Sequence, residues 1–316
     1  MKILFTGASS FTGMWFIKEL AEAGHQITAT FLRNPEEYEG LRRERVDQVL
    51  QWCQPVYDCP FGSDTFLKVI EKEPHWDLLC HHAADVTDYK NPDFDYSTAL
   101  AKNTHNLRKV LMSLKEKGCQ KILLTGSVFE QGEGEGSDFL RAVSPYGLSK
   151  GLTSDVFKFY CQILKLNLGK FVIPNPFGPY EEPRFTTFLI KSWYDGKTPS
   201  VSHPEYTRDN VPVSLLAKAY RNFAESLSET QGYKQLNPSC YAGNQGDFTL
   251  RFAKEMEKRL SIPCNVELQK QQEFQEPHIR INSDTLDPKK LGWNEDNAWN
   301  ELADYYKVKY GSKQTA

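Results

Sequence analysis

The feature that most constrains the fold is the alternation of short apolar runs with helical patterns through the first half of the chain. An apolar run begins at residues 3–5, a helical spacing follows over residues 15–23, and a β-rich run covers residues 26–32. Gly24 stands between the last two, where a glycine commonly ends a helix. This order is typical of a parallel sheet that is covered by helices on both faces.

The same alternation continues further along the chain. It predicts strands at residues 78–80, 121–124 and 169–173, with helices over residues 96–116 and 146–164 between them. These connections are long enough for right-handed parallel crossovers. The sequence therefore predicts an α/β fold, a Rossmann-type doubly wound parallel sheet.

Four prolines crowd residues 174–183, so regular structure is expected to stop there. We predict a nucleotide-binding domain over residues 1–175. Residues 176–316 are predicted to form a smaller, mainly substrate-binding C-terminal region, with some segments returning to the first domain.

Charge and apolar content exclude several kinds of partner. The net charge is -3 and the basic residues are spread along the chain, which argues against nucleic acid. No window has the apolar length that a membrane span needs, and Met1 leads straight into the first strand, so we expect a cytoplasmic protein. The seven cysteines are widely spaced without a CxxC pair, which predicts reduced thiols and no metal site.

A glycine turn at residues 6–13, Thr-Gly-Ala-Ser-Ser-Phe-Thr-Gly, joins the first strand to the first helix. Backbone N–H groups and the positive end of a helix bind a dinucleotide pyrophosphate at such a place. The middle glycine of the usual fingerprint is a serine here, and a plain strand-to-helix turn is the alternative. The predicted cofactor contacts are Gly7, Ser9, Ser10, Phe11, Thr12 and Gly13.

The second strand pattern ends in Arg33 without a carboxylate, which normally binds a free ribose 2′-hydroxyl. A guanidinium can pair with a 2′-phosphate, so we predict NADP as the cofactor, with NAD as the alternative. Asp58, after the third strand pattern, is predicted to accept a hydrogen bond from the adenine amine. Its alternative role is a helix N-cap.

Three side chains form the predicted catalytic group. Tyr146 and Lys150 lie four residues apart, so they project from one face of a helix. A neighbouring ammonium favours the phenolate and lowers a tyrosine pKa from about 10. Ser127 follows the strand at residues 121–124, where its hydroxyl would meet a substrate oxygen. The alternatives are a surface Tyr and Lys pair and a turn serine.

With the glycine turn, His81-His82-Ala83-Ala84 after a strand, Ser127 and the Tyr146/Lys150 pair in order, the chain resembles the extended short-chain dehydrogenase/reductase superfamily of NAD-dependent epimerases and dehydratases. The likeness spans nearly the whole chain. Further matching segments are residues 174–180, 206–211 and 291–293.

The resemblance implies roles for particular residues. Ser127, Tyr146 and Lys150 would be catalytic, the last two also touching the cofactor together with Ala83 and Ala84. It implies a nucleotide-sugar substrate whose phosphate or sugar side contacts Asn175 and whose diphosphate contacts Arg208. The alternatives for these two are a loop-capping asparagine and a surface ion pair of Arg208 with Asp209. Family members commonly form homodimers through two helices, here those expected from residues 96 and 146.

Departures from the family pattern narrow the choice of reaction. Ser10 replaces a glycine, and Leu100 stands where the family often has an asparagine. Sugar-nucleotide 4,6-dehydratases carry an Asp-Glu pair directly after the catalytic Ser or Thr, because loss of water needs an acid and a base. Val128 and Phe129 occupy that place, which argues against dehydration.

What remains is reversible hydride transfer. The main hypothesis is NADPH-dependent reduction of a nucleotide-linked 4-keto-6-deoxy sugar. The first alternative is a nucleotide-sugar 4-epimerase that holds NAD tightly, and another is reduction of a non-sugar carbonyl. An alternative of another class is a non-catalytic NAD(P)-binding scaffold or sensor.

Overall fold

The computed structural model describes the chain except for residues 137–138, 228–230, 273–275 and 312–316. The chain divides into two compact units. The first unit comprises Met1–Glu133, Leu140–Ile173 and Ala217–Pro238, and the second comprises Gly134–Phe139, Pro174–Leu216 and Ser239–Ala316. The second segment of the first unit ends at Ile173, and a third segment follows at Ala217–Pro238. The predicted division into residues 1–175 and 176–316 stays a prediction. The assignment of the first unit to the cofactor also remains a prediction.

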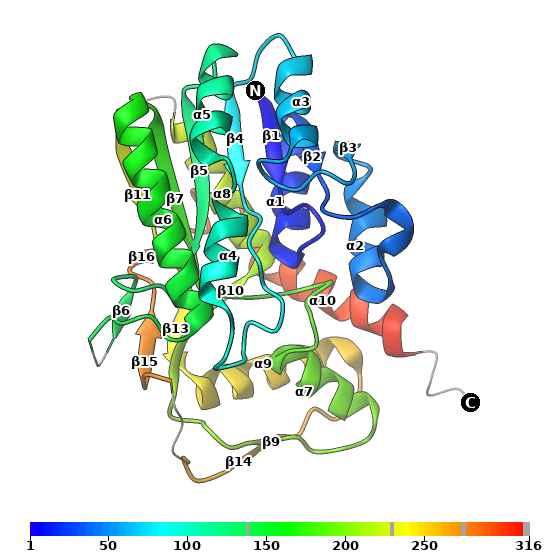
Figure 1. The fold of residues 1–316 in the computed structure, drawn as a ribbon. Helices are drawn as coiled ribbons and strands as arrows, with labels where there is room; N and C mark the ends of the chain where they lie inside the picture. Colours follow the sequence, from blue (N-terminus) through cyan, green and yellow to red (C-terminus); the bar gives the residue numbers. More distant parts are fainter. Residues whose placement is uncertain (137–138, 228–230, 273–275, 312–316) are drawn as a thin grey trace. The chain divides into compact units, whose positions relative to one another are not determined.

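A seven-stranded parallel sheet forms the centre of the first unit (Figure 1), in the order β11-β7-β5-β4-β1-β2-β3. This order confirms the predicted doubly wound fold. The chain reverses its direction of travel across the sheet between β1 and β4, and ligands of such sheets bind outside the carboxyl ends of the strands at that point. The strands are β1 (Lys2–Thr6), β2 (Gln26–Thr30), β3 (Gln54–Val56), β4 (Leu78–His81), β5 (Lys121–Ser127), β7 (Asn167–Ile173) and β11 (Tyr233–Leu236).

Helices bury both faces of this sheet because successive strand side chains point to opposite sides. Leu4 belongs to a core with α3, α5 and α6, whereas the ring of the next residue, Phe5, lies 6.4 Å from that of Tyr220 on α8. Tyr220 in turn stacks on Phe16 of α1 at 4.0 Å. The helical elements are α1 (Phe11–Glu22), η1 (Pro35–Glu37), α2 (Gly40–Val49), α3 (Asp64–Lys72), α4 (Tyr96–Asn103), α5 (Leu107–Glu116), α6 (Pro145–Leu164) and α8 (Val213–Ser226).

Two helices differ from the sequence expectation. The single helix predicted over residues 96–116 is two helices, α4 and α5. Asn106 adopts the left-handed conformation at φ 50°, and its amide donates to the carbonyl of Gly62 at 2.9 Å, so the chain leaves the helical path there. Helix α1 begins at Phe11, before the predicted start, because the Ser10 side chain caps it by accepting the N–H of Gly13.

The second unit contains a small sheet in the order β13-β10-β15-β6, with β8 paired to β10. Because β8 lies inside the proline-rich segment, the prediction that regular structure stops at residue 174 is wrong for these three residues. The strands of this sheet are β6 (Glu135–Gly136), β8 (Asn175–Phe177), β10 (Thr207–Pro212), β13 (Tyr241–Asn244) and β15 (Ile279–Ile281). Two further pairs join β9 (Ser200–Val201) to β14 (Glu267–Leu268) and β12 (Pro238–Ser239) to β16 (Asp284–Thr285).

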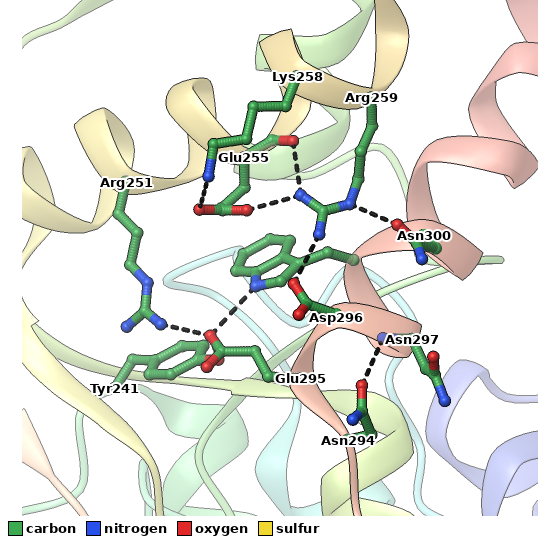
Figure 2. Close-up of polar contacts among 11 residues, drawn as sticks. Tyr241, Arg251, Glu255, Lys258, Arg259, Asn294, Glu295, Asp296, Asn297 and Asn300 are labelled. Carbon is green, nitrogen blue, oxygen red and sulfur yellow. Dashed lines mark hydrogen bonds and ion pairs between the residues drawn. The ribbon is translucent and has the colours of Figure 1, made fainter.

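Helices α7 (Phe185–Tyr194), α9 (Gln245–Leu260) and α10 (Glu295–Tyr310) pack around an apolar core in this unit. Figure 2 shows the polar contacts between α9 and α10. The Glu295 carboxylate accepts hydrogen bonds from the Tyr241 hydroxyl at 2.5 Å and the Trp299 indole at 3.1 Å, and it pairs with Arg251. Arg259 reaches from α9 to Asp296 at 3.0 Å. These contacts fix the start of α10.

Candidate active site

The turn after β1 has no room for a side chain at its first glycine. Gly7 has a φ of +82°, and a Cβ placed there would lie 2.8 Å from the backbone nitrogen of Ala83, which follows β4. The carboxyl ends of β1 and β4 therefore meet through bare backbone. Gly7 is therefore required for the close approach of the Ala83 backbone.

Ser10 replaces the middle glycine, and its side chain turns into the loop. Its hydroxyl donates to the carbonyl of Gly7 at 2.8 Å and accepts the N–H of Gly13 at 3.1 Å. The first N–H groups of a helix have no partner within it, which leaves those of Phe11 and Thr12 for an anion. The cofactor contacts predicted at this turn, Ser9 included, stay a prediction.

His82 connects this turn to the neighbouring strand. Its Nε2 lies 3.0 Å from the Ser10 hydroxyl and its Nδ1 lies 3.0 Å from the Thr125 hydroxyl on β5. Burial, reinforced by the Lys150 ammonium, lowers the pKa of His82 to about 3. The sequence analysis gave His82 no role, since its partners lie far away in the chain.

Arg33 and Asp58, the predicted adenosine contacts, lie next to each other where β2 and β3 end. The backbone N–H of Asp58 donates to the carbonyl of Arg33 at 3.4 Å, and Asp58 is left-handed at φ 47°. The Arg33 side chain is exposed. The alternative role of Asp58 as a helix cap is wrong, because Ser63 caps α3 by accepting the N–H of Phe66.

Helix α6 carries Tyr146 and Lys150 to the end of β5. Ser144 caps the helix, and a Cβ on Gly147 would lie 2.2 Å from the carbonyl oxygen of Phe129, so the first turn packs directly on the chain after β5. The Lys150 ammonium donates to the carbonyl of Thr125 at 2.5 Å. The predicted pair thus lies at the strand end that carries the predicted serine.

The environment of Lys150 lowers its affinity for a proton. The side chain is only 5 % exposed. Burial lowers the pKa of Lys150 to about 8, with the Glu130 carboxylate opposing this and the Lys170 ammonium adding to it. Glu130 and Lys170 are charged residues that the sequence analysis missed. A lysine within the apolar run at residues 169–173 was the available signal, because a buried charge requires a partner.

Ser127 and Tyr146 present their hydroxyl groups from different elements. The Ser127 oxygen accepts the N–H of Phe129 at 3.2 Å, and no described residue accepts the hydroxyl hydrogen. The Tyr146 ring packs against Tyr89 and Phe94, with centroids 5.5 and 6.1 Å away. These two aromatic residues come from the segment between β4 and α4, and no local pattern marks them.

The segment after β4 is held by side chains of two other elements. The Thr6 hydroxyl accepts the N–H of Ala83 at 3.0 Å, and Asn103 on α4 accepts that of Asp85 at 3.0 Å. Ala84 lies between these two anchors. Asn103 is buried. The position where the family often has an asparagine is that of Leu100, about one helical turn earlier.

The predicted substrate contacts lie in the second unit. The buried side-chain nitrogen of Asn175 on β8 has no hydrogen-bond partner among the described residues. Arg208 on β10 donates to the Glu276 carboxylate at 2.9 Å and to the carbonyl of Thr207 at 2.9 Å. The alternative prediction, a surface ion pair of Arg208 with Asp209, is wrong. Asp209 is fully buried and accepts the backbone N–H of Cys240.

The described residues contain no group of three or more His, Cys, Asp or Glu side chains that could hold a metal ion. Within the same part of the chain, no helix combines the length and apolar character of a membrane span.

Solved structures with this fold include several sugar-nucleotide epimerases. The UDP-glucose 4-epimerase of Thermotoga maritima is 16% identical with a TM-score of 0.72, covering 98% of this chain and 99% of its own. The UDP-N-acetylglucosamine 4-epimerase of Methanobrevibacter ruminantium is 15% identical with a TM-score of 0.73, covering 98% of each chain. A UDP-glucuronic acid 4-epimerase from Bacillus cereus, solved with NAD, is 17% identical with a TM-score of 0.73, covering 98% and 100%.

No curated protein matches the chain in sequence. A family model described as "NAD dependent epimerase/dehydratase family" matches residues 3–237, most of the chain. The predicted resemblance is thereby confirmed, and the protein is an NAD(P)-dependent enzyme of the short-chain dehydrogenase/reductase type. The chain belongs to the NAD-dependent epimerase/dehydratase family.

Proposed function

We propose that the protein is a nucleotide-sugar 4-epimerase that holds NAD tightly. The epimerases of the same fold act on UDP-linked sugars, and this supports the epimerase alternative over the NADPH-dependent reductase that the sequence analysis preferred. Val128 and Phe129 follow Ser127 where a dehydratase needs an acid and a base, which argues against loss of water.

The observation that carries the catalytic proposal is the Lys150 ammonium fixed on β5 one helical turn from Tyr146. A cation at that place favours the phenolate of Tyr146, which can then accept the proton of a sugar 4-hydroxyl. Ser127 donates its free hydroxyl hydrogen to the same sugar oxygen and stabilises negative charge there. A bound nicotinamide dinucleotide supplies reversible hydride transfer.

The second unit is proposed to hold the nucleotide side of the substrate. The unpaired amide of Asn175 would find a phosphate or sugar oxygen as its partner, which removes the cost of a buried unsatisfied donor. Arg208 would contact the diphosphate. The phosphate oxygens would then compete with the Glu276 carboxylate for the Arg208 guanidinium.

The test is to incubate purified protein with UDP-glucose, UDP-N-acetylglucosamine and UDP-glucuronic acid, without added cofactor. Interconversion of 4-epimers, together with NAD released on denaturation and identified by mass spectrometry, is the expected result. Failure to convert any of the three, with no NAD released, contradicts the proposal.

The second candidate is an NADPH-dependent reductase of a nucleotide-linked 4-keto-6-deoxy sugar. The observation in its favour is Arg33, which is exposed directly after β2, where the run Thr30-Phe31-Leu32-Arg33 has no acidic residue. Net consumption of NADPH with a nucleotide-linked 4-keto-6-deoxy sugar, without 4-epimer interconversion, would select this function.

We propose a homodimer that uses α6 together with its neighbour α5. Phe159 and Ile163 on α6 are 57% and 58% exposed, and a hollow between α5 and α6 includes Met112 and Tyr160. Light scattering on the wild type and on Ile163→Asp tests this. Wild-type dimers that dissociate in the variant are expected, and a monomeric wild type contradicts the proposal.

A further inference from the structure

A buried cluster of charges lies beside the end of β5. Glu130 is 0% exposed, and its carboxylate is 2.6 Å from the Lys170 ammonium on β7. Glu133, 5% exposed, pairs with the same ammonium at 2.6 Å. The far oxygen of Glu133 accepts a hydrogen bond from Gln235 at 2.7 Å. Burying three charged groups is costly, and apolar side chains would pack there at least as well.

One member of the cluster, Glu130, contacts the proposed catalytic residue Ser127. The second oxygen of Glu130 accepts the backbone N–H of Ser127 at 2.7 Å. A Cβ on Gly126 would lie 2.7 Å from the Lys170 stem and 3.1 Å from the Glu130 carboxylate, so the pair crosses directly over that glycine. Glu130 therefore fixes the backbone that presents Ser127.

Lys150 lies beside this cluster, because its ammonium binds the carbonyl of Thr125, directly before the Gly126–Ser127 backbone that Glu130 and Lys170 contact. The charges of this region balance only when Lys150 is counted. Glu130, Glu133 and Lys170 sum to one negative charge, and the Lys150 ammonium supplies the missing positive charge. Burial raises the pKa of Glu130, while Lys170 and Lys150 both favour its ionised form. Among the described residues, His81 and His82 interact electrostatically with Lys150, and Tyr146 lies one helical turn from it. The two histidines are held neutral, with pKa values lowered to about 3 mainly by burial.

We propose that Glu130 is a positioning residue for catalysis, which holds Ser127 at the strand end and keeps Lys150 a cation through the charge it shares with Lys170. This inference rests on the proposed roles of Ser127, Tyr146 and Lys150 but does not depend on which sugar is bound. Glu133 provides the matched control. It is buried in the same cluster and contacts Lys170, yet its hydrogen bonds go to Gln235 and Asn237 and not to Ser127.

The experiment measures the titration of Lys150 directly, by NMR of protein labelled with ¹³Cε-lysine. The Lys150 signal is assigned through its loss in Lys150→Met. In Glu130→Gln the midpoint should move down by about one pH unit or more, because an attractive charge is removed and Lys170 remains. In Glu133→Gln it should stay close to the wild-type value. An unchanged midpoint in Glu130→Gln, or an equal shift in Glu133→Gln, overturns the proposal.

A second variant covers the case in which Glu130→Gln does not fold. Lys170→Met removes the ammonium that repels the Lys150 cation, and Glu130 no longer shares its charge with Lys170. The Lys150 midpoint should therefore rise. A midpoint that stays or falls rejects the proposal.

Turnover separates this inference from the proposed function. If the wild type epimerises a UDP-sugar, the alkaline limb of its kcat/KM profile should move to lower pH in Glu130→Gln and not in Glu133→Gln. If the wild type converts no UDP-sugar while the NMR midpoints shift as expected, the proposed substrate is wrong and the role of Glu130 stands. If the wild type epimerises a UDP-sugar but the Lys150 midpoint does not move in Glu130→Gln, the proposed function stands and the proposed role of Glu130 is wrong.

Discussion

The ammonium of Lys150 donates to the backbone carbonyl of Thr125, so the helix with the predicted acid/base pair is tied to the strand that ends in Ser127. This contact crosses from α6 to β5, and it is stronger when Lys150 is protonated because an ammonium is a better donor than a neutral amine. The protonation of one buried side chain therefore affects both the local structure of the site and its chemistry.

Activity should fall as the pH rises through about 8. Burial lowers the pKa of Lys150 to about 8, and the cation that favours the Tyr146 phenolate is lost above that value. The kcat/KM profile between pH 6 and 10 checks this. Lys150→Met should lose about a hundredfold or more at pH 7, whereas Lys158→Met, two turns along the same helix, should keep its activity. A flat profile up to pH 10 would contradict the role of Lys150.

Tyr146→Phe should lower turnover by about two orders of magnitude or more, because the proton acceptor is removed while the ring and its packing on Phe94 remain. Cofactor affinity, measured by calorimetry, should change little. Tyr160→Phe on the same helix serves as the control. A Tyr146→Phe enzyme that works at the wild-type rate would remove the catalytic assignment.

Arg33→Ala should weaken NADPH binding more than NADH binding, since only NADPH carries the 2′-phosphate that a guanidinium recognises. Fluorescence titration with both cofactors gives the comparison. Arg43→Ala should have a smaller effect because Arg43 is engaged with Asp47 and the carbonyl of Pro35. Equal losses for both cofactors in Arg33→Ala would mean that Arg33 does not select between them.

The folded protein should lose stability as the pH falls below about 6.5. Burial lowers the pKa of His81 and His82 to about 3 in the folded state, whereas unfolded histidine titrates near 6.5. Between these values the unfolded chain binds more protons, at a cost of about 1.4 kcal/mol per pH unit for each histidine. Urea unfolding at pH 7, 6 and 5 measures the slope, which should be shallower in His82→Gln. The same slope in both proteins would contradict this account.

The sequence alone determined the features that depend on neighbours along the chain. The glycine turn between strand and helix, the alternation of strands with helices, and the Tyr146/Lys150 spacing are all local, because each depends on residues within one turn, strand or helix. The break at Asn106 escaped prediction, since the amide contact with Gly62 that accompanies it lies outside the helix.

Only the tertiary structure decided which charges and polar groups meet. Glu130 and Lys170 are forty residues apart, and they pair because β5 and β7 are adjacent in the sheet. His82 reaches Ser10 and Thr125 because β4 lies between β1 and β5. The energy of a buried charge or ring nitrogen is set by partners in space, and an amino-acid pattern does not identify those partners until the strands are placed.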